Sequence, residues 1–228
     1  MPKNDRDFKI SDAELMEHAE TITATLPSDM PDFTAFDSTI TVEYIPQLQA
    51  AIADVKEFPT DNVLIDEMAE HTLSVKQVLD ECYEDYKTIA YFVRKAFADN
   101  PAIRNQFGLN DIEKARSSQP KMIVFMQSLA KTAAKYGESL MGVGCKEELI
   151  AGLPEKAAIL NEVNIEQEKF KNDRAIITQD RVRALNVVYR MLQPLHNAAE
   201  FIYKDDPVRY SIYTMPHSAP PENPENPD

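Results

Sequence analysis

Two short segments of this chain repeat one pattern, and each of them closes a long stretch of helical spacing. The first is FADNP at residues 97–101, with Phe107 six residues beyond the proline. The second is YKDDP at residues 203–207, with Tyr213 at the same distance. Proline cannot continue a helix and disfavours helical geometry in the residue before it, so both segments predict a helix end with an aromatic residue packed over it. The pattern therefore predicts that one helical hairpin occurs twice.

The spacing of apolar residues predicts an all-α protein. All five glycines lie between residues 108 and 152, and no run of alternating β-branched residues predicts a strand. Four long helices are expected, at residues 37–58, 61–97, 120–141 and 154–204. Helices of this kind bury their apolar stripes against one another. We therefore expect an elongated antiparallel four-helix bundle built from a duplicated hairpin, with repeat one at about 37–109 and repeat two at about 110–215.

A capping box predicts a short helix before this bundle. The Ser11 hydroxyl accepts the N–H of Glu14, and Glu14 reaches back to the N–H of Ser11. Pro27 and Pro31 are expected to end the helix, because neither has an N–H to continue it. Residues 1–36 are then an N-terminal extension outside the bundle of residues 37–215. Residues 216–228 are rich in proline and acidic, which predicts a disordered tail.

Charge and cysteine content narrow the classes of partner. The chain of 228 residues carries a formal net charge of −14. Phosphates would be repelled by such a surface, so neither nucleic acid nor a membrane is an expected partner. Cys82 and Cys145 lie far apart, which predicts two reduced thiols rather than a disulfide or a cysteine zinc site. With no apolar signal segment near the start, a soluble, cytoplasmic protein is expected.

No catalytic site, metal site or cofactor is predicted. Di-iron bundles need a glutamate three residues before a histidine, and the four residues at that position here are Leu15, Met68, Gln193 and Thr214. Cys145 follows two glycines and precedes a helical pattern, where a helix N-terminus would lower the pKa of its thiol. No histidine near it in sequence offers a base. The chain is therefore expected not to be an enzyme.

Polar residues interrupt the apolar stripe of the last long helix, at Gln167, Arg174, Thr178 and Arg181. Buried arginine has to be paired, and the acid-rich helix at 61–97 offers partners. Three interpretations stay open: a polar layer that fixes helix register, side chains that reach the rim of the bundle, or a pocket for an anionic ligand between helices. These four residues are the candidate ligand-binding site.

Two segments resemble the uncharacterised helical-bundle proteins common in Bacteroidetes genomes. One runs from Thr178 through Arg181 and Tyr189 to residues 201–205, and the other is its counterpart around Phe97. The resemblance covers most of residues 37–215. The resemblance implies a helical bundle of unknown function, and it assigns no catalytic residues to this chain.

The expected function is that of a non-enzymatic interaction or scaffold protein, acting through a protein partner or through self-association. The alternative is a binding module for a small anionic ligand, with the polar pocket described above. A metal oxidoreductase of ferritin type is a third hypothesis, which predicts bound iron or manganese.

Overall fold

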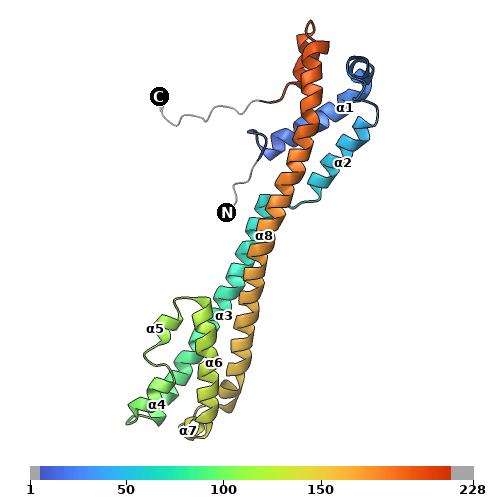
Figure 1. The fold of residues 1–228 in the computed structure, drawn as a ribbon. Coiled ribbons are helices and arrows are strands. Elements are labelled where there is room, and N and C mark those ends of the chain that lie inside the picture. Colours follow the sequence, from blue (N-terminus) through green and yellow to red (C-terminus); the bar gives the residue numbers. More distant parts are fainter. Residues whose placement is uncertain (1–5, 217–228) are drawn as a thin grey trace, which may run out of the picture. The chain divides into compact units, whose positions relative to one another are not determined.

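The computed structural model describes residues 6–216, and every regular element in that range is a helix. The predicted all-α class is confirmed (Figure 1). The helices are α1 (Asp12–Phe36), α2 (Tyr44–Lys56), α3 (Asp61–Ala96), α4 (Pro101–Gln106), α5 (Ile112–Ala115), α6 (Gln119–Lys135), α7 (Gly137–Gly142), α8 (Glu147–Ile202) and α9 (Pro207–Tyr213).

The chain divides into two compact units. Unit 1 contains residues up to Asp61 together with those from Ala175 onward, and unit 2 contains Asn62–Arg174. This division differs from the expected single bundle of residues 37–215, because α8 is one helix of 56 residues that begins in unit 2 and ends in unit 1. The four-helix bundle and the duplicated hairpin stay predictions. Of the predicted tail, only Pro216 lies within the described residues.

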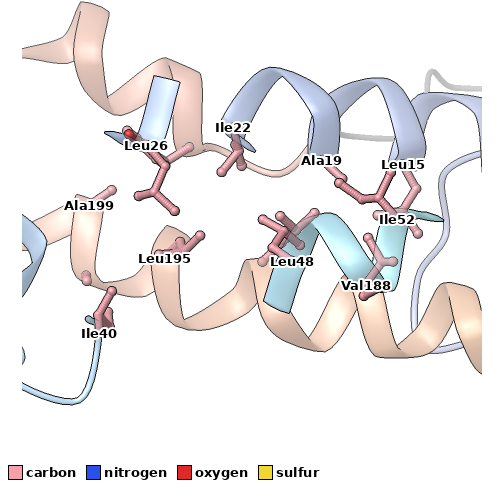
Figure 2. Close-up of a cluster of buried hydrophobic side chains, with 14 of the residues drawn as sticks. Leu15, Ala19, Ile22, Leu26, Ile40, Leu48, Ile52, Val188, Leu195 and Ala199 are labelled. Atoms are coloured by element: carbon pink, nitrogen blue, oxygen red, sulfur yellow. The ribbon is translucent and has the colours of Figure 1, made fainter. Parts of the chain in front are cut away.

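Unit 1 is built on α1, α2 and the second part of α8. Figure 2 shows apolar side chains of the three helices pointing toward one another. The largest contribution comes from residues of α1 and α8 that repeat every three or four positions. The fully buried members of this core include Leu15, Ala19, Ile22, Leu26, Phe33, Leu48, Leu185, Val188, Leu192 and Leu195. The interpretation of residues 1–36 as an extension outside the main body is therefore wrong: α1 is a core helix of unit 1.

The prediction that Pro27 and Pro31 end the first helix is also wrong. Both prolines lie inside α1, which continues to Phe36. A proline in a helix interior costs about 3 kcal/mol. Met30 and Phe33 follow the first proline and are buried in the core of unit 1, so their packing holds the helical geometry through both sites.

Unit 2 is built on α3, α6 and the first part of α8, with the short helices α4, α5 and α7 around them. Its core has no member in common with that of unit 1. The fully buried residues include Cys82, Ile89, Val93, Met126, Ala133, Leu140, Leu153 and Leu160. The expected helix at 120–141 is divided here at Tyr136, between α6 and α7.

The two proline segments have the same local geometry. Asn100 has φ −124° and ψ 82°, and its side chain accepts the N–H of Ile103 at 3.1 Å. Asp206 has φ −126° and ψ 82°, and its side chain accepts the N–H of Arg209 at 3.1 Å. Each proline is thus the first residue of a short helix, where its missing N–H costs nothing. The aromatic residues that follow, Phe107 and Tyr213, are both buried.

Candidate functional site

The four residues of the predicted ligand-binding site are distributed over both units. Gln167 and Arg174 belong to unit 2, whereas Thr178 and Arg181 belong to unit 1. Gln167 and Arg181 each have protein partners within their own unit. Arg174 and Thr178 are half-buried and make no hydrogen bond or ion pair with other described residues.

Gln167 is the buried polar residue of unit 2, with an exposed fraction of 3%. Its Nε2 donates to Oγ1 of Thr72 at 3.1 Å, and its Oε1 accepts from Nε2 of Gln119 at 3.3 Å. The amide therefore connects α8 with α3 and with the start of α6. A buried amide that finds partners in this way is satisfied without a ligand.

Arg181 is a cation of unit 1 that is paired with two carboxylates. Its guanidinium lies 3.1 Å from Oδ2 of Asp12 and 3.2 Å from Oδ1 of Asp61. Asp12 is the first residue of α1, and it also contacts Arg6 at 3.0 Å. An anionic ligand would have to displace two carboxylates from Arg181. The geometry therefore favours the interpretation as a polar layer, and the assignment of a ligand site to these four residues stays a prediction.

A groove on unit 2 lies between α3 and α8 and has a volume of about 630 Å³. Most of its lining comes from successive turns of α3, and α8 contributes one lysine. The lining residues are Leu73, Lys76, Gln77, Asp80, Glu81, Glu84, Asp85 and Lys156. We call this feature the α3–α8 groove. None of the four residues predicted from the sequence lines it.

Four carboxylates give the α3–α8 groove its charge. Glu81 accepts from Nζ of Lys156 at 2.6 Å and from Nε2 of Gln77 at 3.1 Å. The hydrogen bond from Lys156, followed by that from Gln77, lowers the pKa of Glu81. Burial raises the pKa of Asp85, and the charge of Glu81 adds to this, while Lys156 opposes it. Lys156 thus lies beside both Glu81 and Asp85, and Glu84 is paired with Lys87 on the same helix. With Lys76 and Lys156 as the two cations of the lining, the four carboxylates still leave an excess of negative charge.

The cysteines do not offer a reactive thiol. Both are free and buried. Burial raises the pKa of Cys82 to about 11, and it also raises the pKa of Cys145. A helix start can lower the pKa of a thiol, but the pKa of Cys145 is raised instead, because burial disfavours the thiolate. Among the described residues, no three side chains of His, Cys, Asp or Glu are grouped to hold a metal ion.

The buried acid Asp29 of unit 1 was not predicted from the sequence. Asp29 has an exposed fraction of 4%, and its Oδ2 accepts from the hydroxyl of Tyr213 at 2.9 Å. Arg209 lies 3.9 Å from its other oxygen. Burial and the hydrogen bond to Asp29 raise the pKa of Tyr213. No pattern around Asp29 marks it as buried, because the two prolines on either side of it predict a loop.

Comparison of the chain with models of protein families, with curated proteins and with solved structures finds no match. The resemblance to helical-bundle proteins of Bacteroidetes stays a prediction. Within residues 6–216, no helix has both the length and the apolar composition needed to cross a membrane.

Proposed function

We propose that this chain is a non-enzymatic interaction protein that binds a positively charged amphipathic helix in the α3–α8 groove. The observation that carries this function is the composition of the groove: four carboxylates against two lysines, with one exposed leucine on α3. An apolar stripe flanked by basic residues is the complementary pattern, and recognition of such a helix in a groove is a common mode of binding.

The acids of the groove include two like-charge pairs on α3, in each of which one carboxylate is also paired with a lysine. Asp80 and Glu84 are four residues apart on α3, as are Glu81 and Asp85. Like charges at this spacing destabilise a helix by about 0.2–0.5 kcal/mol per pair. A basic partner would remove this repulsion, so the charge pattern favours a cationic occupant over a neutral one.

Leu73 supplies the apolar contact. Its exposed fraction is 65%, which is high for a leucine on a helix that also contributes to a core. A helix lying along the groove would cover this side chain. Burying a leucine side chain contributes about 1.5–3 kcal/mol. The site therefore combines one apolar anchor with a surrounding electrostatic attraction.

The charge also favours a different partner over a second copy of the chain. Each copy has a formal net charge of −14, so two α3–α8 grooves would repel each other. The alternative of a small anionic ligand is less favoured, because the guanidinium of Arg181 is already bound by Asp12 and Asp61. Arg174, which has no ion pair among the described residues, belongs to the other unit.

Peptide binding tests this function. The chain has no tryptophan, so a tryptophan in a leucine–lysine amphipathic peptide reports binding by its fluorescence. We expect saturable binding that weakens at least tenfold between 50 and 300 mM salt, since the attraction is screened. The variant Asp80→Asn/Glu84→Gln should lose most of the affinity.

A matched control separates the groove from general attraction to an acidic protein. Glu162 and Glu166 are exposed on α8, are four residues apart and do not line the groove. The variant Glu162→Gln/Glu166→Gln changes the net charge equally and should leave binding unchanged. Equal weakening by both double variants would show diffuse attraction and would contradict the proposed function.

A further inference from the structure

An exposed pair of stacked phenylalanines lies in unit 1, outside the α3–α8 groove. Phe36 is the last residue of α1, and Phe201 lies in the last turn of α8. Their ring centroids are 5.8 Å apart and their planes differ by 14°. The exposed fractions are 54% for Phe36 and 64% for Phe201. We call these two residues the Phe36–Phe201 stack.

Single exposed apolar residues are common on protein surfaces. Two adjoining exposed aromatic rings form an apolar patch whose hydration is unfavourable. The corresponding position in the other proline segment is occupied differently. Lys95 stands four residues before Asp99, as Phe201 stands four before Asp205, and Nζ of Lys95 donates to the carbonyl of Val143 at 2.8 Å. Unit 2 thus uses this position for an internal hydrogen bond, and unit 1 uses it for an exposed ring.

The surroundings of the stack are negative. Neither α1 nor α8 has a basic residue in its last turn, and acids adjoin the two rings in the sequence, Asp37 after Phe36 and Glu200 before Phe201. The two cations that follow Phe201 in the sequence each lie beside an acid: Lys204 is an exposed side chain 3.9 Å from Asp205, and Arg209 lies 3.4 Å from Asp32. A cation brought by a partner would meet both an aromatic face and a negative field.

From these observations we propose that the Phe36–Phe201 stack is a second docking site, which takes an arginine-containing apolar segment of a partner protein. A guanidinium stacks flat on an aromatic ring, and its charge is attracted to the face of the ring. Apolar residues beside the arginine cover the rest of the patch. A second copy of this chain fits poorly, because it would bring the same acids to the contact. The inference goes beyond the proposed function, since it concerns another surface in the other unit.

The experiment uses a chain in which the groove is already neutralised by Asp80→Asn/Glu84→Gln. The probe is a peptide of arginine, leucine and one tryptophan, and its match is the same peptide with citrulline in place of arginine. We expect binding of the arginine peptide, with at least tenfold weaker binding of the citrulline peptide. Because the groove is neutralised throughout, failure here leaves the proposed function untouched.

Variants of the stack assign the binding to these rings. Phe201→Ser should weaken the arginine peptide at least tenfold, and Phe201→Leu, which keeps apolar area but loses the ring, should weaken it less. Val124→Ser removes an equally exposed apolar residue of α6 and should change nothing. If Phe201→Ser binds as tightly as the parent while its thermal midpoint falls, the stack has only a structural role and the inference is overturned.

Discussion

At the scale of single residues, the hydrogen bond between Tyr213 and Asp29 is the contact whose loss we expect to affect the stability of unit 1. The carboxylate is buried, and the hydroxyl of Tyr213 donates to it at 2.9 Å. Loss of this donor leaves a buried charged oxygen without a partner, which costs about 1–3 kcal/mol. We therefore expect Tyr213→Phe to lower the free energy of unfolding of unit 1 by this amount, measured by urea denaturation.

Two further variants check that the hydrogen bond is the cause. Tyr210→Phe removes a hydroxyl that makes no hydrogen bond with other described residues, and it should change stability by less than about 0.5 kcal/mol. In an Asp29→Leu background, Tyr213→Phe should cost little, since the partner is gone. An equal loss in both backgrounds would mean that the hydroxyl acts through something other than Asp29.

The candidate site was predictable only in part at this scale. The apolar spacing put Gln167 on the stripe of the last long helix but left open whether it is buried, and the structure buries it. The spacing could not show that Thr72 and Gln119 satisfy its amide, since those residues are about 95 and 48 positions away. For Arg181, an acid from the start of the helix at 61–97 was within the expected range, and Asp12 was not, because α1 was not recognised as a core helix.

At the scale of elements, α1 shows packing overriding a local signal. Pro27 has no N–H to donate to the carbonyl of Thr23, and yet the helix continues because Leu26 and Met30 are buried on either side. Pro27 itself is exposed. We expect Pro27→Ala to raise the free energy of unfolding by about 1–2 kcal/mol. Replacing proline by alanine removes a helix penalty of about 3 kcal/mol. The more flexible unfolded chain offsets about 1 kcal/mol of this gain.

Pro46 provides the matched control for this prediction. It is exposed and lies in the first turn of α2, where a backbone N–H has no carbonyl partner within the helix. Pro46→Ala should therefore leave stability unchanged or slightly reduce it, as judged by the urea midpoint. If Pro27→Ala destabilises unit 1 instead, the proline fixes a local geometry that the core requires.

At the scale of the whole molecule, the sequence predicted the class and the helix ends better than the grouping of helices. The glycine-free stretches and the two proline segments correctly indicated long helices and where they close. The division at Asp61 lies at the break expected between the helices at 37–58 and 61–97. The division at Arg174 left no such mark, because the α8 helix continues through it without a break. Which helices share a core depends on which of their apolar stripes pack together. The sequence of one helix does not show which other helix its stripe contacts.

Because the two cores share no residue, we expect them to lose protection independently. Leu195→Ala removes a fully buried side chain of unit 1, and Met126→Ala removes one of unit 2. Each should cost about 2–5 kcal/mol in its own unit. Hydrogen exchange read by mass spectrometry should then show faster exchange in α1, α2 and the end of α8 for Leu195→Ala, and in α3 and α6 for Met126→Ala. Equal loss of protection everywhere in both variants would mean that the chain unfolds as one cooperative body, with α8 transmitting each local defect along its length.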